Sequence, residues 1–302
     1  MYQISLSTMW AKGRFSNMAK FVATTRGLGF SHVEANASVS PQGLNELIQT
    51  SIPISSIHCP CPAVLSSKGI PIANLSPSSI EKSEREEAVN FARRTISLAR
   101  KVGAGAVILH MGEVPIDLGL EVELRQLYQQ NLTQTERYKQ VKEQLIYQRA
   151  SQASPYLEAA RKSLEELSQY SQEQGIMLGL ETRFYFHEIP NIEEMEDLLN
   201  EMKGRPVGYW HDVGHAEVQQ QLGFASHEEW LSRFSHRMIG IHLHDVIGIS
   251  DHRPPGKGNM NWEMVAKHLP CRATRVCEIA EWNEEKQIQG VVNFLREKEV
   301  TN

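Results

Sequence analysis

The feature that most constrains the fold of this chain is a repeated alternation between short apolar runs and longer amphipathic segments. Short runs rich in Val, Ile and Leu are typical of buried strands, and the amphipathic segments are typical of helices. The alternation therefore predicts repeated βα units around a parallel sheet. Helices are expected at 17–26, 44–50, 77–102 and 192–202 and from 284 onward. Eight strands are expected, at 3–7, 32–35, 54–58, 106–110, 176–181, 207–212, 239–243 and 275–279.

Eight such units fit an α/β fold, a single (β/α)8 TIM barrel. The chain of 302 residues is then expected to form one domain over 1–302. The main rival is a doubly wound open sheet, which would bind a dinucleotide through a glycine-rich turn after its first strand. No such turn follows residues 3–7, so the sequence favours the barrel.

Two connections are longer than a minimal barrel requires. Residues 111–175 separate the fourth strand from the fifth, and the part from 111 to 150 is expected to be a helical insertion over the barrel mouth. A lid, a dimer contact and a solvated decoration are all compatible with this insertion. Residues 60–79 form a Pro- and Ser-rich loop, which is long enough to be functional.

Composition excludes several classes of protein. The net charge is −5 and 41% of the residues are hydrophobic, which is ordinary for a soluble globular protein and gives no general affinity for nucleic acid. No stretch approaches the roughly 18 apolar residues that cross a membrane. The four cysteines form no dense disulfide framework, and Cys59-Pro60-Cys61 is interpreted as ordinary buried thiols. These features predict a cytoplasmic protein without a membrane partner.

Imidazole and carboxylate side chains occur at the carboxyl ends of most of the expected strands. In a barrel all of these ends open onto one face, so the side chains are expected to converge there. Any single one has a structural explanation, but six strands in succession ending in His, Glu or Asp do not. Neutral His together with Asp and Glu is a ligand set for divalent metal ions. The sequence therefore predicts a metal site built from His58, His110, Glu181, Asp212, His242 and Glu278.

The sixth and seventh strands add further candidates. Asp212 and His215 are three residues apart across a strand-to-helix turn, so both can face the mouth, and an N-capping role is the structural alternative for Asp212. His242 and His244 share one face of the seventh strand, and His242 is the expected ligand of the two. Two more candidates lie in the loop after that strand, Asp251 and His252.

Several residues near the mouth are expected to contact a substrate. Arg253 and Lys257 can hold a phosphate or another oxyanion, with simple solvation as the alternative for Lys257. Arg183 shares the alternation of Glu181, and it either orients that carboxylate or binds substrate. The remaining candidates are Glu34, at the end of the second strand, and the aromatic residues Trp10, Phe184 and Tyr185, which either form walls for a sugar ring or pack in the core.

The ordered set of these residues resembles the xylose isomerase-like TIM-barrel superfamily. The motifs that carry the resemblance are Asp212-x-x-His215, His242-Leu-His-Asp, and His252 before a Pro-x-Gly-x-Gly turn. The resemblance covers essentially the whole barrel, with residues 111–150 outside it. This superfamily includes sugar and sugar-phosphate isomerases and epimerases, and also endonuclease IV, a nuclease that acts at abasic sites in DNA.

The epimerase branch of this superfamily implies one divalent metal ion. Its ligands would be Glu181, Asp212, His242 and Glu278. In those relatives the two glutamates also form the acid/base pair that moves a proton at the sugar carbon. The positions of His215 and Arg253 contact the substrate there.

The endonuclease IV branch implies up to three zinc ions. The second would use the same four ligands, with Glu181 bridging to the first. The other ligands would be His58 and His110 for the first zinc ion, and His215, His252 and an aspartate for the third. The family pattern for that aspartate is Asp-x-His, whereas here Ser250 occupies its place and Asp251 directly precedes His252. The chain therefore departs from the family pattern at the third metal ion.

These features together favour a divalent-metal-dependent isomerase or epimerase of a sugar, sugar phosphate or sugar-like polyol, with Glu181 and Glu278 as metal ligands and acid/base pair. The alternatives are an endonuclease IV-like zinc phosphodiesterase and a metal-dependent lyase or hydrolase of a cyclitol-like metabolite. The expected cofactors are one to three ions of Zn, Mn, Mg or Co. The expected partner is a small carbohydrate-like molecule, with nucleic acid only under the nuclease alternative, and a homo-oligomer stays open.

Overall fold

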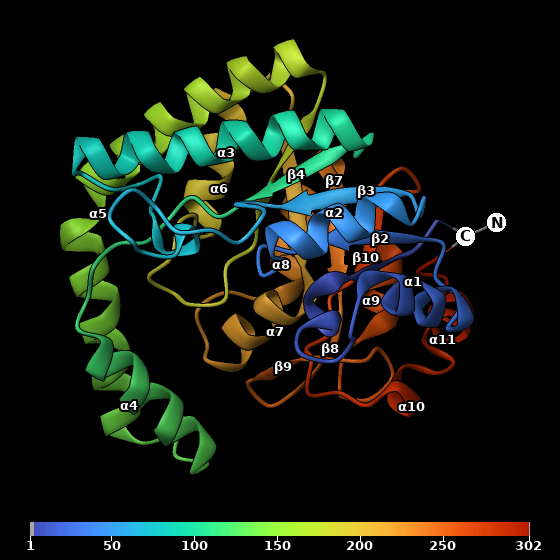
Figure 1. The fold of residues 1–302 in the computed structure, drawn as a ribbon. Helices are drawn as coiled ribbons and strands as arrows, with labels where there is room; N and C mark the ends of the chain where they lie inside the picture. The colour runs from blue at the N-terminus through green and yellow to red at the C-terminus, as the bar shows by residue number, and fades with distance from the viewer. Residues whose placement is uncertain (1–2, 302) are drawn as a thin grey trace.

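The computed structural model describes residues 3–301, and within them eight parallel strands close into a barrel in the order β1-β10-β7-β6-β5-β4-β3-β2 (Figure 1). The prediction of a (β/α)8 TIM barrel is confirmed. The domain expected over 1–302 includes residues 1, 2 and 302, which lie outside the described residues. The barrel strands are β1 Ser5–Ser7, β2 His32–Ala35, β3 Ile54–His58, β4 Ala106–Leu109, β5 Met177–Glu181, β6 Val207–Asp212, β7 Met238–Leu243 and β10 Thr274–Cys277.

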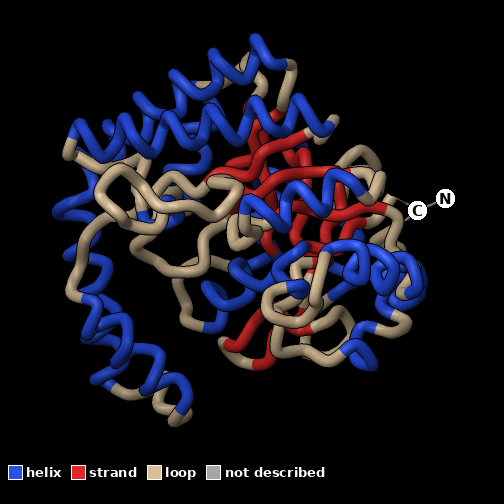
Figure 2. Tube along the Cα trace, viewed as in Figure 1, coloured by secondary structure: helices blue, strands red, loops and turns tan. Residues whose placement is uncertain are grey.

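Helices surround this barrel on its outside (Figure 2). Several begin where the sequence supplies a capping side chain: Asn17 caps α1, Ser40 caps α2, and Asn191 forms a capping box at α6. The α-helices are α1 Met18–Gly27, α2 Pro41–Gln49, α3 Lys82–Val102, α4 Leu118–Gln129, α5 Glu136–Gln174, α6 Ile192–Glu201, α7 Val213–Gln221, α8 His227–Phe234, α9 Trp262–His268, α10 Glu285–Ile288 and α11 Val291–Glu297. Short 3₁₀ turns occur at Thr8–Ala11, Ile72–Asn74 and Ser235–Arg237.

One large side chain fills the barrel interior beneath the site. Trp210 of β6 is fully buried, and two glycines make room for its ring. A Cβ on Gly240 would lie 2.0 Å from Cζ3 of Trp210, and one on Gly179 would lie 2.9 Å from Cε3. The ring of His242 lies edge-on to Trp210, with 5.3 Å between centroids. The packed interior is therefore the floor on which the polar residues at the strand ends stand.

The connection between β4 and β5 differs from the expected separate insertion at 111–150. It consists of α4 and of α5, a single helix of 39 residues that continues through residue 150 and contains Pro155. The later part of α5 lies beside α3 as a barrel helix, and α4 projects from the body (Figure 1). Near its start, α5 is tied to the end of α7, because the hydroxyl of Tyr138 donates to the carbonyl of Leu222 at 3.0 Å.

The helix expected from residue 77 begins later, at Lys82. The serines before it hydrogen-bond to other groups: Ser78 donates to the carbonyl of Glu113 at 3.3 Å, and Ser79 donates to the carboxylate of Glu84 at 3.1 Å. Serine side chains that bond locally in this way compete with helix formation. The start of this helix was therefore predicted five residues too early.

The segment after β7, expected to be a loop, is a two-stranded antiparallel hairpin. Its strands are β8 Asp245–Ile247 and β9 Ser250–Arg253. Asp245 is fully buried, and its carboxylate accepts backbone N–H groups from Gly256 at 2.8 Å and from Met260 at 2.9 Å. This aspartate joins the hairpin to the Pro- and Gly-rich turn that follows.

Two further expectations concern the whole chain. Among the described residues, no helix is both long enough and apolar enough to span a membrane. The four cysteines are unpaired, and burial raises the pKa of the Cys59 and Cys61 thiols to about 12, so both stay protonated. They are ordinary buried thiols, as expected.

Candidate metal centre

Four side chains from adjacent strands meet at the carboxyl end of the barrel. They are Glu181 at the end of β5, Asp212 at the end of β6, His242 in β7 and Glu278 directly after β10, and all are buried. Nδ1 of His242 lies 2.6 Å from Oε1 of Glu181, 3.3 Å from Oε2 of Glu278 and 3.5 Å from Oδ2 of Asp212. One ligand atom from each residue lies within 4.8 Å of the others, so the four can surround a single ion. We call them the quartet.

The opposite edge of the His242 ring is held by Glu34. Nε2 of His242 lies 3.2 Å from Oε1 of Glu34, and the hydroxyl of Ser56 donates to the same carboxylate at 2.8 Å. A carboxylate behind a histidine fixes the ring and leaves its other nitrogen free to face a metal ion. Glu34 was expected to contact substrate, but it is fully buried behind His242. Asn36, which the sequence did not single out, holds Glu278 in a comparable way at 3.1 Å.

The charges of the quartet fit a divalent cation. Burial alone would lower the pKa of His242, but Glu278, Glu34 and Glu181 outweigh it and raise that pKa well above its usual value. Burial would likewise raise the pKa of Glu278, but His242 and His252 lower it to about 2. Three buried carboxylates that face one another need a positive charge among them. Two glutamates, an aspartate and an imidazole form the mixed oxygen and nitrogen set that binds zinc, manganese or cobalt.

A second group of ligand atoms lies on the other side of Glu181. Nε2 of His110 is 2.5 Å from Oε2 of Glu181, and Nε2 of His58 is 3.6 Å from the same oxygen. Arg183 also reaches this oxygen, with Nη1 at 3.0 Å. His110 has 38% of its side chain exposed. Loss of hydration within the mouth, and then the charge of Arg183, nevertheless lower its pKa to about 4. His110 is therefore neutral at physiological pH.

A third group consists of His215, Asp251 and His252. Oδ2 of Asp251 lies 2.9 Å from Nδ1 of His252 and 3.8 Å from Nε2 of His215. The family pattern Asp-x-His puts both side chains on the same side of an extended strand. Asp251 and His252 are direct neighbours, so in an extended strand they would point to opposite sides. His252 has a positive φ of 54°, and this breaks the alternation. The structure therefore brings Asp251 into the group although Ser250 occupies the family position.

Asp212 and His244 link the quartet to this third group. Oδ1 of Asp212 accepts the backbone N–H of His215 at 2.7 Å and so caps α7, while Oδ2 faces His242. The capping role therefore coexists with a place in the quartet. Nε2 of His244 donates to Asp212 at 2.9 Å, and Nδ1 of His244 accepts the backbone N–H of His252 at 2.9 Å. His244 thus supports the two groups from behind, as expected.

The remaining substrate candidates are divided between the rim and the core. Arg253 stacks on Trp282 at 5.1 Å, and Trp282 is 53% exposed. Lys257 is exposed, whereas Trp10 is fully buried and donates to the backbone of Asn283. Trp10 is therefore a core residue and no wall of the mouth.

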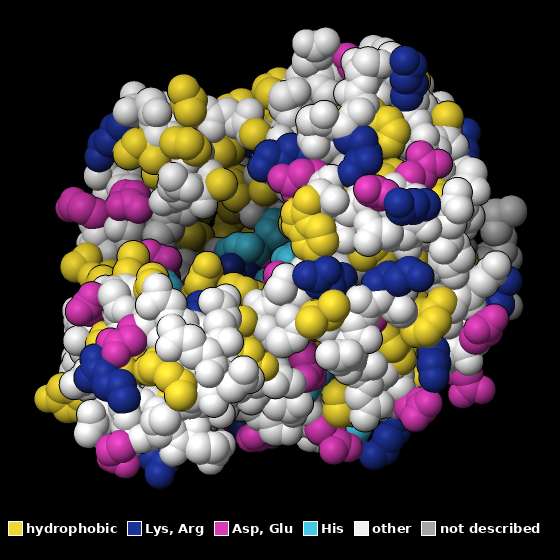
Figure 3. Space-filling model, turned by 90° about the horizontal axis from the view of Figure 1, so that it is seen from below, with side chains coloured by type: hydrophobic (Ala, Val, Ile, Leu, Met, Phe, Trp, Pro, Cys, Tyr) yellow, Lys and Arg dark blue, Asp and Glu magenta, His cyan; other side chains and the backbone are white. Residues whose placement is uncertain are grey.

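Aromatic side chains from the loop after β5 form another part of the rim. The guanidinium of Arg125, on α4, lies 4.4 Å from the ring centroid of Phe184 and 4.6 Å from that of Tyr185. Seen from this side, the molecule is hollowed, with histidine side chains in the hollow and hydrophobic, Lys and Arg side chains around it (Figure 3). Arg125 and Trp282 were missed by sequence reasoning, because only tertiary packing brings them to the mouth.

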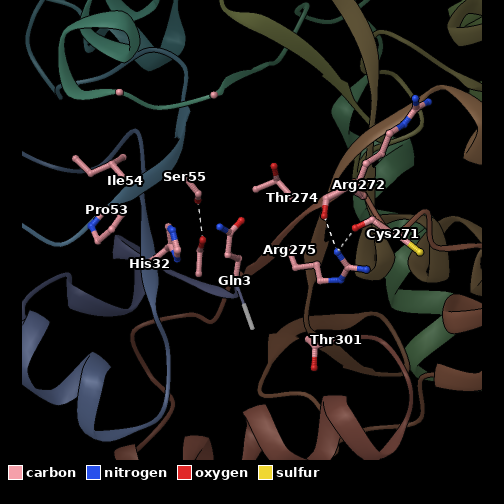
Figure 4. A pocket seen from close by; sticks show the side chains of 14 residues that line it. Gln3, His32, Pro53, Ile54, Ser55, Cys271, Arg272, Thr274, Arg275 and Thr301 are labelled. Atoms are coloured by element: carbon pink, nitrogen blue, oxygen red, sulfur yellow. Dashed lines mark hydrogen bonds between the residues drawn. The ribbon is translucent and has the colours of Figure 1, made fainter. Parts of the chain in front are cut away.

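Another cavity, of about 800 Å³, lies at the opposite end of the barrel (Figure 4). It is lined by the first residues of the strands, including Ser5, His32 and Ser55, and by Arg275. The hydroxyls of Ser5 and Ser55 are 2.7 Å apart. None of the described residues that line it is an Asp or Glu. It offers no group of metal ligands.

Comparisons with known proteins agree with this fold. The model of the family described as xylose isomerase-like TIM barrel matches residues 22–298. A D-tagatose 3-epimerase-like protein has a TM-score of 0.67 at 18% identity, covering 98% of this chain and 96% of that chain. D-psicose 3-epimerase with D-tagatose, from Clostridium cellulolyticum H10, has a TM-score of 0.69 at 15% identity, covering 98% of this chain and 99% of that chain. An uncharacterized protein of Methanocaldococcus jannaschii is 24% identical over 241 residues, which are 78% of this chain and 74% of that protein.

Proposed function

This chain belongs to the xylose isomerase-like TIM barrel family, and we propose that it is a divalent-metal-dependent isomerase or epimerase of a sugar, a sugar phosphate or a sugar-like polyol. Glu181, Asp212, His242 and Glu278 would hold the metal ion. The observation that carries the proposal is that the carboxylates of Glu181 and Glu278 meet at the same nitrogen of His242, with oxygens 2.6 Å and 3.3 Å from Nδ1.

Two glutamates in this arrangement can move a proton at a carbon next to a carbonyl group. Both have pKa values held below the usual range by neighbouring histidines, so both are ionised at neutral pH and able to accept a proton. For epimerisation, one glutamate removes the proton from one face of the carbon and the other delivers a proton to the opposite face. A divalent ion bound by the quartet would polarise the substrate oxygen and stabilise the charge that develops there.

The rim supports a small polar substrate with a ring or an extended carbon chain. His215 is buried beside Asp251 and close to Phe184, with 5.4 Å between ring centroids, so it can contact substrate hydroxyls from that wall. Arg253 and the exposed face of Trp282 lie on the hairpin side of the mouth. Structural neighbours described as acting on ketoses, such as D-psicose 3-epimerase, agree with this substrate class.

A second candidate function rests on one specific observation. Besides the quartet, the mouth holds the group of His58, His110 and Glu181 and the group of His215, Asp251 and His252. An epimerase with one metal ion does not require either of these groups. Ions in all three groups could activate a water molecule and stabilise the leaving oxygen of a phosphodiester, as an endonuclease IV-like phosphodiesterase would.

Exchange of carbon-bound hydrogen tests the first proposal without advance knowledge of the product. The protein, loaded in turn with Mn²⁺, Co²⁺, Mg²⁺ or Zn²⁺, would be incubated with a panel of ketoses and ketose phosphates in D₂O. Loss of a proton signal next to the carbonyl, followed by NMR, is the expected result. Incision of a duplex with one abasic site, in the absence of any such exchange, would replace this proposal with the nuclease. Apoprotein and the Glu181→Gln variant are the matched controls.

A further inference from the structure

We infer that Arg183 is a fixed internal cation beside Glu181, so that this carboxylate serves one metal ion instead of bridging two. The inference deepens the proposed function and rests on it for the identity of the quartet as the metal-holding group. Arg183 would then be a positioning residue that sets how many ions the mouth accepts.

Arg183 is held at the inner wall of the mouth next to that carboxylate. It lies two residues after Glu181, so both side chains point to the same side of the extended backbone. Its Nη1 donates to Oε2 of Glu181 at 3.0 Å, and its Nη2 donates to Glu188. Only 5% of Arg183 is exposed. A buried guanidinium bonded to two carboxylates has a defined place and a permanent charge.

The groups next to Arg183 are themselves held in place by hydrogen bonds. The other oxygen of Glu188 accepts the backbone N–H of Tyr185 at 2.8 Å, and the carbonyl of Glu188 accepts from Arg149 at 3.0 Å. The amide of Gln219 donates to the carbonyl of Arg183 at 2.6 Å. The carboxylate and the carbonyl of Glu188 are therefore both held by hydrogen bonds, and the backbone of Arg183 is held by Gln219.

The guanidinium and a second metal ion would compete for the same oxygen atom. Oε2 of Glu181 is the atom that His110 and His58 approach, at 2.5 Å and 3.6 Å, and it is also the atom that Arg183 contacts. An ion drawn into this group would lie beside a cation in a poorly solvated place, where like charges repel strongly.

Oε1 of Glu181 faces the other way, toward His242 at 2.6 Å. The carboxylate is thus divided, with one oxygen for the quartet and the other for Arg183 and His110. Hydrogen bonds already satisfy the second oxygen, and His110, which is partly exposed, keeps an edge available to a substrate hydroxyl.

Metal counting tests the inference directly. Wild type and the variants H110N, R183Q and R183Q/H110N would be loaded with Zn²⁺ or Co²⁺, passed through a desalting column and analysed for metal per chain. We expect R183Q to bind one ion more than wild type, R183Q/H110N to lose that extra ion, and H110N alone to keep the wild-type count. R183K keeps the charge and is the control that should match wild type. Any ion in the group of His215, Asp251 and His252 is common to all of these variants and cancels.

Two outcomes overturn the inference: an unchanged metal count in folded R183Q, or the loss of one ion in H110N alone. If circular dichroism shows that R183Q does not fold, R183Q/E188Q removes both charges of the buried pair and carries the same expectation. The H110N variant tests the inference with Arg183 left unaltered. None of these measurements depends on turnover. Absence of sugar exchange would therefore count against the proposed function, while the metal counts would still decide the role of Arg183.

Discussion

The two ends of this barrel are both hollow, but their polar groups are arranged in opposite ways. At the amino-terminal end, the cavity of about 800 Å³ contains Arg275, whose guanidinium donates to the backbone carbonyls of Val300 at 2.6 Å and Ala273 at 2.8 Å. At the carboxyl end, carboxylates and imidazoles point at one another across distances of 2.5–3.6 Å.

The difference shows that the presence of a cavity does not by itself identify the functional end. The guanidinium of Arg275 donates its hydrogen bonds to backbone carbonyls of the chain, so its charge is not directed at a ligand. The quartet and the groups beside it concentrate buried carboxylates and imidazoles that face one another, and such clusters mark functional sites. One end of the barrel is thus built for stability and the other for chemistry.

The sharpest test of this comparison is removal of one glutamate of the quartet. We expect Glu181→Gln and Glu278→Gln each to lower turnover by at least about 10³-fold, because a general acid/base group is lost. Both variants should stay folded, but their melting temperature at neutral pH should be lower than that of the wild-type apoprotein, since each carboxylate has a pKa that is lowered in the folded state and therefore stabilises the fold when it is ionised. Near-normal turnover in both variants would show that the chemical centre lies elsewhere.

The opposite pattern is expected at the other end. Arg275→Met should lower the free energy of unfolding by about 2–4 kcal/mol, because buried carbonyls lose their hydrogen-bond donor. Turnover per folded molecule should change by less than about twofold. Arg272→Met is the matched control, because Arg272 is exposed and donates to one carbonyl, that of His236 at 3.2 Å. Chemical denaturation measures the first effect, and loss of turnover in folded Arg275→Met would break the comparison.

Acidification should weaken the chemical end through Glu188. Burial would raise the pKa of Glu188, but Arg183, His110 and the N–H of Tyr185 lower it to about 2. A carboxyl group whose pKa is lowered in the folded state stabilises the fold at every pH above its pKa in the unfolded state. This stabilisation is lost as the pH falls toward its pKa in the folded state. Glu188 should thus contribute roughly 3 kcal/mol above about pH 5, and the contribution should vanish as the pH falls from about 4.5 to 2.

The measurement is the free energy of unfolding in denaturant between pH 6 and pH 3, compared for wild type and Glu188→Gln. The variant will be less stable at neutral pH, because its partner Arg183 stays buried. Its stability should decline less steeply in acid than that of wild type. Parallel curves would contradict the assigned role of Glu188.

The smallest effect is expected at the rim. Trp282→Ala should raise KM by about 3–10-fold and leave kcat nearly unchanged, because an exposed aromatic face contributes to binding without touching the reacting atoms. Steady-state kinetics with the best substrate of the ketose panel would measure it. A large fall in kcat instead would show that Trp282 acts in the reaction step and not only in substrate binding.

Sequence reasoning placed the barrel and the quartet because both follow from local patterns. Buried strands alternate with helices, and in a barrel the residue that ends each strand must face the mouth, which brings Glu181 and Glu278 together. The relation of Asp251 to His215 could not be predicted, since it depends on the positive φ of His252 in a hairpin. The bond between Arg183 and Glu188 arises from a loop whose course is set by tertiary contacts.

The bend of α5 has a consequence for how the mouth admits its ligands (Figure 1). The first part of α5 packs against α4 and its later part packs beside α3, and a buried ion pair between Arg149 and Glu194, with atoms 2.6 Å apart, fastens its middle. α5 is helical from residue 136 to 174 but is bent along its length (Figure 1), and Pro155 inside it lacks the backbone N–H that a continuous helix would use there. The direction in which α4 projects, and with it the width of the entrance on this side, is therefore set by the bend in α5.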